Sequence, residues 1–445
     1  MTNESRPRLA NQSAPFTERR FLVPFALITC LFFLWALGVN LNDVLIPRFR
    51  DAFGLSDFQS SFIQVAFFGG YFLAAFPAGW LMEHIGYKRG ILTGLALCAT
   101  GALLFLPASA AGLYRYFLLA LFVMACGQSF LEVASNPYVT ILGPAGSSER
   151  RLNFAQSFNA VGAVMAPLIG GAFILTGVEH TPSQLAALTS AQLHAYRAAE
   201  ASSVRLPYVA IAGIFVFMAA VIRFTHLPDV TEKASGAASP EPPPDSVFGH
   251  AHLVRGVIAQ FFYVGAQVGV ASFVIRFAQH TVPGMTARLA AYYLLGHQIG
   301  FMSGRFAGSA MMKRIAAPRL LSAFAVGCLL CITIALITSG IVPVWAVVVI
   351  GFFHSIMFPT IFALSIKNLG PLTKRGSSLL VMSIIGGAIF PAIMGRISDA
   401  SNIQTAFIVP LICYVYILYF AMKGYRPVKT GRPAVAVAGA EAQGS

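Results

Sequence analysis

The amino-acid sequence predicts an all-α membrane protein with twelve transmembrane helices arranged as two six-helix bundles. Three observations support this prediction: an apolar composition, apolar runs that recur along the chain, and a similarity between its two halves. Of the 445 residues, 57% are hydrophobic and only 10% are charged. A water-soluble chain of this length could not bury so much apolar surface.

Apolar runs long enough to cross a bilayer recur almost from one end of the chain to the other. A hydrocarbon core of about 30 Å takes roughly 20 apolar residues in a helix. Lipid offers no hydrogen-bond partners, so each backbone amide must be satisfied within its own helix. The predicted spans begin near positions 21, 57, 90, 113, 152, 206, 251, 287, 319, 344, 376 and 403.

The chain divides near its middle. The segment between the sixth and seventh spans is polar, is rich in Pro, Ser and Ala, and is typical of a linker. The halves resemble each other, because Gly79–Arg89 after the second span corresponds to Gly304–Arg314 after the eighth. Two similar halves are typical of transporters that bind a solute near the membrane midplane and rock around it. We expect a tail at 1–20, a first bundle at 21–226, a linker at 227–250, a second bundle at 251–423 and a tail at 424–445.

Lys and Arg residues indicate the orientation. They gather in the N-terminal tail and in alternate connections, for example Lys88 with Arg89 and Lys374 with Arg375. This distribution predicts that both termini are cytoplasmic. The net charge of +14 could suggest nucleic-acid binding. However, the basic residues are scattered over short loops and offer no continuous face to phosphates, so we expect no nucleic-acid partner.

Two carboxylates, Asp43 and Glu132, lie inside stretches that are otherwise apolar. A charge in hydrocarbon is costly, so such a residue faces a protein interior or a wet cavity and commonly serves protons, ions or substrate. A dry cavity favours the protonated form of a carboxyl group, which suits a group that exchanges a proton in each cycle. We predict that both couple transport to protons, with Glu132 as the carrier and Asp43 as an aid to gating. The alternative is a helix-to-helix hydrogen bond from a permanently protonated acid.

Amide and aromatic side chains within the apolar spans predict a binding site for a polar solute. Asn136 lies one turn from Glu132, next to Pro137, which would open the helix there. Amides suit sugar hydroxyls because each offers donors and an acceptor, although they can also simply hold helices together. The predicted substrate contacts are Trp35, Asn40, Asn136, Gln156, Asn159, Gln260, Gln267 and Phe358.

Charged residues at helix ends predict a cytoplasmic gate. We expect them to hold the cytoplasmic ends of the two halves together in the outward-open state, because carboxylates and carbonyls are available there. The gate residues are Glu83, Lys88 and Arg89 in one half and Lys313 and Arg314 in the other.

Two further basic residues are interpreted as structural. Arg305 follows the second-half loop motif and is expected to anchor a helix end near the cytoplasm. Lys367 lies near the inner end of the tenth span, where its stem can reach the headgroups.

Several motifs carry a family resemblance. The loop Gly79-x-x-x-Glu83-x-x-Gly86-x-Lys88-Arg89 resembles the cytoplasmic signature of the major facilitator superfamily, with Glu where Asp is usual. The resemblance to the bacterial L-fucose permease group implies a major facilitator fold and an inner-membrane symporter that imports a monosaccharide with a proton. It rests on segments spread over nearly the whole membrane region: Phe32–Trp35, Asn40–Asp43, Leu131–Pro137, Asn153–Asn159, Tyr263–Gln267, Pro283–Thr286, Pro359–Phe362, Ile366–Gly370 and Ile384–Gly387.

The chain departs from the fucose-permease pattern in its second half. It has Met357 and Phe358 where that pattern has a Gln-Tyr pair, and Ala271 where it has Trp. These departures remove amide, hydroxyl and indole groups from the expected cavity. We expect a neutral monosaccharide, L-fucose or a related hexose or N-acetylhexosamine, with L-fucose itself handled weakly.

The chain contains neither the Gly-x-x-x-x-Gly-Lys-Ser/Thr loop of ATP binding nor the Gly-x-Ser-x-Gly nucleophile elbow. We therefore expect no enzymatic activity, no cofactor and no bound metal, with the proton gradient as the driving force. The expected partners are a sugar, protons and the lipid bilayer, and the expected state is a monomer. Two alternatives remain: proton-driven export of a small amphiphile, against which the Asn and Gln set argues, and a sugar receptor that binds without transport.

Overall fold

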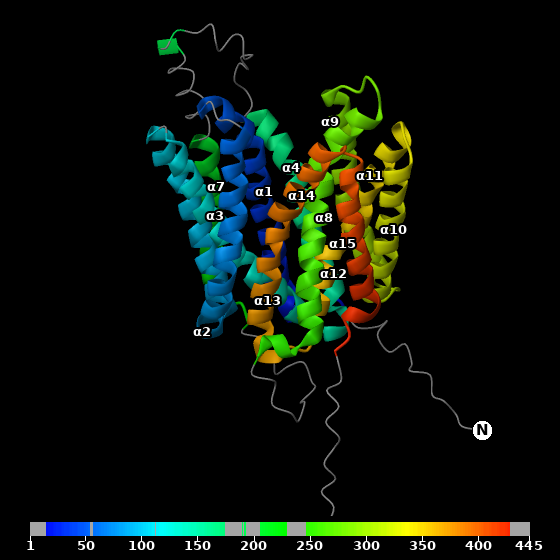
Figure 1. Ribbon diagram of the computed structural model, residues 1–445. Helices are drawn as coiled ribbons and strands as arrows, with labels where there is room; N and C mark the ends of the chain where they lie inside the picture. The colour runs from blue at the N-terminus through cyan, green and yellow to red at the C-terminus, as the bar shows by residue number, and fades with distance from the viewer. Residues whose placement is uncertain are drawn as a thin grey trace, which may run out of the picture.

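The computed structural model describes residues 15–53, 57–111, 113–173, 189, 191–192, 205–228 and 246–427. The regular elements within these ranges are helices. Helix α1 begins and helix α15 ends at the bottom of Figure 1, which we call the lower end; the opposite end is the upper end. Residues 229–245 of the predicted linker lie outside the described residues.

The first half of the chain contains five labelled helices. Helix α2 holds two of the predicted spans, because it is interrupted at Gly86, whose φ of 76° and ψ of 172° are not helical. Glycine adopts a positive φ without steric cost, which explains why it occupies this position. The helices are α1 (Leu22–Phe53), α2 (Asp57–Ala111), α3 (Tyr114–Ile141), α4 (Ser148–Phe173) and α7 (Arg205–Phe224).

The second half builds its six spans from eight labelled helices. One span is divided between α11 and α12, and another consists of α13 and α14 joined by a 3₁₀ turn at Ser383–Ile385. The helices are α8 (Ala251–Thr281), α9 (Ala287–Met311), α10 (Ala317–Ile337), α11 (Ile341–His354), α12 (Met357–Ser365), α13 (Thr373–Met382), α14 (Gly386–Ala400) and α15 (Ile408–Tyr419).

Nine helical stretches in the described ranges are long and apolar enough to cross a membrane. One of them, Phe62–Ala111, contains the second and third predicted spans. Helices α4 and α9, with 26 and 25 residues, are also long enough at about 1.5 Å per residue, although they are more polar. The helices that the structure describes thus account for all twelve predicted spans.

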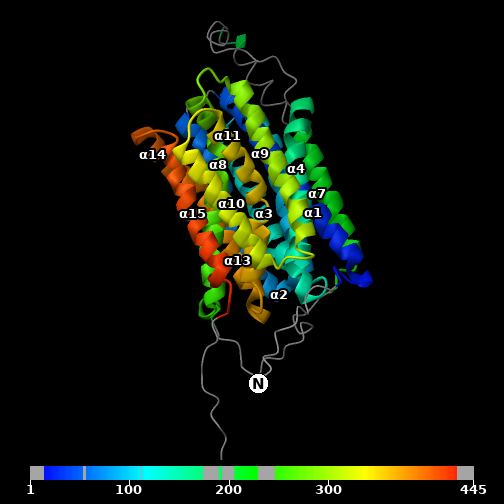
Figure 2. The ribbon, with the colours of Figure 1, turned by 90° about the vertical axis from the view of Figure 1, so that its right-hand side faces the viewer.

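The two halves stand side by side and meet along several helices. Helix α2 contacts α13, and α4 contacts both α9 and α12; Figure 2 shows α4 next to α9. The α2–α13 approach is close, because a Cβ atom at Gly79 would collide with the side chain of Ser378. Large apolar side chains such as Leu206, Phe217 and Ile337 are exposed on the outside. An apolar exterior of this kind suits a surface that faces lipid.

Candidate functional site

Glu132 is buried within α3, with 7% of the residue exposed. Tyr71 of α2 and Asn136, one turn further along α3, lie within reach of its carboxyl group, and the charge of Arg305 on α9 acts on it. The Oγ atom of Ser129 donates to the carbonyl oxygen of Tyr71 at 3.0 Å and fixes α3 against α2. The acid therefore lies in a protein interior, as expected for an ionisable residue of a membrane helix.

A chain of hydrogen bonds runs from Asn136 to the other half of the molecule. Gln156 Nε2 on α4 donates to Asn136 Oδ1 at 2.9 Å. Arg305 Nη1 on α9 donates to Gln156 Oε1 at 2.8 Å and also to the main-chain oxygen of Gln156. Helices α3 and α4 belong to the first half and α9 to the second. The chain therefore links the surroundings of Glu132 to the opposite half.

Arg305 corrects the sequence interpretation. It lies within α9 (Ala287–Met311) rather than at a helix end, and it is 4% exposed. Its guanidinium group lies over the ring of Phe301 at 4.6 Å, and its Nε atom has no partner among the described residues. The expected anchoring role of Arg305 was wrong, because the sequence motif at Gly304–Arg314 does not indicate which helix the Arg305 side chain contacts.

Three other first-half residues predicted to contact sugar lie on α1 or against its positions 32–36. Trp35 is buried, with its ring centroid 4.5 Å from that of Phe32. Asn159 Nδ2 on α4 donates to the main-chain oxygen of Phe32 at 3.4 Å. Asn40 Nδ2 donates to the carbonyl oxygen of Ala36 at 2.7 Å. Each amide keeps an oxygen and a second N–H that can serve a ligand.

The second-half residues predicted to contact sugar lie on α8 and α12. Gln260 is fully buried, and neither amide atom has a partner in the described part of the chain, whereas Gln267 is half-buried. The ring of Phe358 lies 6.2 Å from that of Tyr263. Tyr263 in turn lies close enough to Arg305 for these two side chains to interact electrostatically. The structure thus places Phe358 near the end of the hydrogen-bonded chain.

Asp43 and Gln128 are two further polar residues, one on the first span and one close to it. Asp43 belongs to α1, but its side chain lies outside the described residues. Gln128 was missed by the sequence analysis: it is fully buried, neither amide atom has a partner among the described residues, and it lies near Gly38 of α1. Its position one turn before Glu132 was the available signal, since residues four apart share a helix face.

At the lower end, Glu83 forms an ion pair with a residue that the sequence analysis did not assign to the gate. Arg375 Nε lies 2.6 Å from Glu83 Oε1, and Arg375 Nη2 donates to Glu83 Oε2 at 2.9 Å. Lys88 instead stays within its own half, where its Nζ donates to the carbonyl oxygens of Arg223 and Thr225 at 3.1 and 2.9 Å.

The other proposed gate residues lie on the surface. Arg89 is exposed, as are Lys313 and Arg314 just beyond α9. The gating role of these residues stays a prediction.

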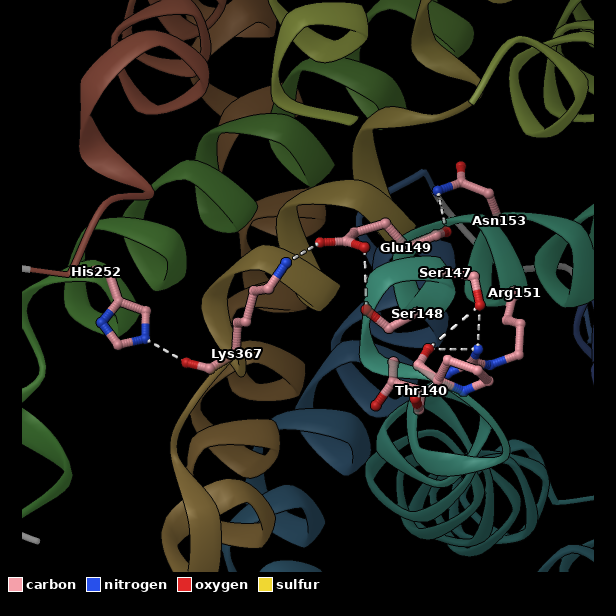
Figure 3. Close-up of polar contacts among 9 residues, drawn as sticks. Thr140, Ser147, Ser148, Glu149, Arg151, Asn153, His252 and Lys367 are labelled. Atoms are coloured by element: carbon pink, nitrogen blue, oxygen red, sulfur yellow. Dashed lines mark hydrogen bonds and ion pairs between the residues drawn. The ribbon is translucent and has the colours of Figure 1, made fainter. Parts of the chain in front are cut away.

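A second ion pair joins the halves at the lower end (Figure 3). Lys367 Nζ, after α12, lies 2.8 Å from Oε1 of Glu149 in the first turn of α4. Ser148 Oγ donates to Glu149 Oε2 at 3.0 Å, and the helix N-terminus favours a negative charge there. One turn further along, Asn153 Nδ2 donates to Thr360 Oγ1 at 3.0 Å. Lys367 thus binds the opposite half instead of reaching only toward headgroups.

Arg151 holds the lower ends of α3 and α4 together (Figure 3). It is fully buried and donates to the main-chain oxygens of Val139 at 3.2 Å and Pro144 at 2.8 Å, and also to that of Thr140. The bond to Thr140 pairs a carbonyl in the last turn of α3, where carbonyls lack partners within the helix. Together the Arg151 bonds fix α3 relative to α4, and hence Asn136 relative to Gln156.

Comparisons with known proteins agree with this architecture. A family model described as Major Facilitator Superfamily matches residues 28–383. The L-fucose-proton symporter of Escherichia coli (strain K12) is 44% identical over 409 residues, which cover 91% of this chain and 93% of that protein. The glucose/galactose transporter of Brucella abortus (strain 2308) is 42% identical over 400 residues, covering 89% of this chain and 93% of that protein.

Solved structures give the same result. The crystal structure of the transporter FucP in the outward conformation matches with a TM-score of 0.84 and 43% identity, over 91% of this chain and 99% of that chain. A proton:xylose symporter, XylE, matches with a TM-score of 0.68 at 12% identity and supports the fold alone. The predicted twelve-helix, two-bundle fold is confirmed, and the relatives are transporters rather than enzymes. The chain belongs to the major facilitator superfamily.

Proposed function

We propose that this chain is a proton-coupled symporter that imports a neutral monosaccharide by alternating access. One observation carries the proposal: a buried acid, Glu132, lies beside a chain of amides that crosses from α3 and α4 to Arg305 on α9. In this proposal the proton-carrying acid, the amides that bind the sugar and the contact between the two halves lie close together. The names of the relatives, an L-fucose-proton symporter and a glucose/galactose transporter, support the same activity.

Glu132 is the proposed proton carrier. An ionised carboxylate costs free energy away from water, so a proton on Glu132 eases any step that passes through a dry state. Asn136 stands next to it with its Nδ2 atom unpartnered among the described residues. That donor is available to a sugar hydroxyl, which would place proton and sugar binding within one helical turn. We assign Asp43 the supporting role in gating.

The lower end is the proposed cytoplasmic end, with both termini in the cytoplasm of a bacterial cell and the chain in its inner membrane. The distribution of Lys and Arg supports this orientation. The pairs Glu83–Arg375 and Glu149–Lys367 hold the halves together at this end. We therefore interpret the structure as a state closed to the cytoplasm. Transport in this scheme needs no cofactor, and a monomer contains the whole pathway.

The second half supplies a partly apolar wall to the sugar. Met357 is fully buried and Phe358 is 8% exposed, next to Tyr263. The amides of Asn159 in the first half and Gln260 in the second are proposed to hydrogen-bond the sugar hydroxyls. We propose a hexose, a deoxyhexose or an N-acetylhexosamine as substrate. Because Met357 and Phe358 replace the Gln-Tyr pair of the fucose-permease pattern, we expect this protein to bind L-fucose only weakly.

Purified protein in liposomes with an inward acid gradient tests the proposal. We expect uphill uptake of at least one radiolabelled sugar from a panel of L-fucose, D-glucose, D-galactose, D-mannose and N-acetylglucosamine, together with sugar-induced proton entry. Tight binding without flux would instead indicate a receptor. Proton-driven efflux of an amphiphilic dye with no sugar uptake would indicate an exporter.

A further inference from the structure

We propose that Arg305 is a positioning residue that couples the charge state of Glu132 to the contact between the two halves. The inference rests on the proposed function and extends it to a residue outside the predicted proton and sugar sites. It starts from geometry: a guanidinium group on α9 is buried at the interface and holds Gln156 on α4.

The environment of Arg305 provides little negative charge. A buried cation is stable only when it is paired and its hydrogen bonds are satisfied. Arg305 is bonded to two oxygens of Gln156, both neutral, and its Nε atom has no partner among the described residues. The described ion pairs do not include it. Glu132 is the described acid whose charge acts on it.

The other titratable groups nearby are neutral at physiological pH in their ordinary state. Tyr263 on α8 faces Arg305, Tyr71 on α2 lies beside Glu132, and Cys98 on α2 lies near Tyr71. The ring of His354 on α11 lies 5.9 Å from that of Tyr263. Phenols and thiols ionise well above pH 7, and Arg305 and His354 do not act on each other electrostatically. Glu132 is therefore the described group that can switch the balance of charge around Arg305.

The consequence is that protonation of Glu132 changes the contact between the two halves. While Glu132 is ionised, its charge offsets that of Arg305 and stabilises the contact with Gln156. When Glu132 takes a proton, Arg305 loses this compensation and its contact with Gln156 weakens. The bond that weakens joins α9 to α4, two helices of opposite halves. Protonation of Glu132 thereby weakens the α4–α9 interface, which must open during transport.

Sugar exchange measured against pH tests the coupling. Counterflow is measured in liposomes that hold the wild-type protein or the variants Arg305→Gln and Arg305→Lys, with each sugar of the panel. Without the positive charge Glu132 keeps its proton to higher pH, so the pH at which exchange is half-lost should rise by about one unit or more in Arg305→Gln. Arg305→Lys keeps the charge and should stay near wild type.

Arg276→Gln is the matched control. Arg276 also lies over a phenylalanine ring, that of Phe273 at 4.3 Å, but it is exposed on α8. Its removal should leave the pH profile unchanged. An Arg305→Gln profile identical to that of the wild type would overturn the proposal.

A measurement without sugar separates this inference from the proposed function. Melting temperatures in detergent at high pH are compared for wild type, Glu132→Gln, Arg305→Gln and the double variant. We expect Arg305→Gln to lower the melting temperature less in the Glu132→Gln background than in the wild type, because the compensating charge is already gone. If the wild type moves no sugar but this non-additivity holds, the proposed function fails and the coupling stands. Additive changes in melting temperature would refute the coupling.

Discussion

At the scale of single residues, the acid at position 132 illustrates what a sequence can predict. A carboxylate in an apolar stretch is visible without a structure, and helical spacing predicts that Asn136 lies beside it. The partners from other helices are not visible in the same way. Nothing local in the sequence indicates that Arg305 would cross to Gln156, because that contact depends on how α9 packs against α4. Gln128 was within reach of the spacing argument and was overlooked.

Sugar preference is a residue-scale prediction. The double variant Met357→Gln/Phe358→Tyr restores the amide and hydroxyl of the fucose-permease pattern at two buried positions. Sites that hydrogen-bond hydroxyls discriminate strongly against ligands that leave those groups unpaired. We expect L-fucose to compete about tenfold better in this variant than in the wild type, measured by inhibition of uptake of the best sugar.

The control for that variant adds a hydroxyl elsewhere on the same helix. Phe362→Tyr places it one turn from Phe358, at a buried position of α12. L-fucose competition should not improve in Phe362→Tyr. If L-fucose already outcompetes the other sugars by a wide margin in the wild type, the interpretation of the two departures is wrong.

At the scale of helices, two ion pairs hold the lower ends together, but they are not equivalent. Exposed pairs contribute about 0–1 kcal/mol, and the pair Glu83–Arg375 has side-chain exposures of 19% and 49%. In the pair Glu149–Lys367 the carboxylate side chain is only 8% exposed. Loss of its partner leaves a buried charge without compensation, which costs more than the loss of a surface pair. We therefore infer that Lys367 contributes more than Arg375 to closure.

Lys367→Met should open the lower end more often than Arg375→Met does. The reporter is Ser309→Cys, because Ser309 is buried at the interface, where its Oγ donates to the main-chain oxygen of Arg150 at 3.4 Å. The six native cysteines are replaced by alanine in this background. We expect labelling by an impermeant maleimide in inside-out vesicles to be about tenfold faster in Lys367→Met, which corresponds to about 1.4 kcal/mol.

Lys367→Arg keeps the charge and is the control for that comparison. Equal labelling rates in Lys367→Met and Arg375→Met would show that burial of Glu149 does not set the strength of closure.

Close approach of α2 and α13 gives a steric prediction. A Cβ atom at Gly79 would collide with Ser378 and would lie 2.9 Å from the main-chain oxygen of Lys374. Gly79→Ala should therefore keep the lower end from closing fully and raise the labelling rate of the same reporter cysteine. Gly69→Ala in the same helix is the matched control, since a Cβ there meets nothing within 4 Å. Unchanged labelling in Gly79→Ala would contradict the need for this contact.

At the scale of the whole molecule, the sequence predicted the fold but not the residue contacts between the two bundles. Hydropathy predicts membrane spans because each span is a local, continuous property of the chain, and the similarity between halves predicts two bundles. The gate shows the limit: the sequence predicted Glu83 as a gate residue but did not predict Arg375, with which the structure pairs it. A charge near a helix end indicates that a contact exists, but the partner is set by the packing of two bundles.

The central claim is that Glu132 carries the proton that drives sugar uptake, and Glu132→Gln tests it most directly. An amide cannot release a proton but keeps hydrogen-bonding groups beside Asn136. In proteoliposomes we predict that this variant retains sugar counterflow and loses pH-driven accumulation and sugar-induced proton entry. A Glu132→Gln protein that still accumulates sugar against its gradient under an acid gradient, with proton entry at the wild-type rate, would contradict the account.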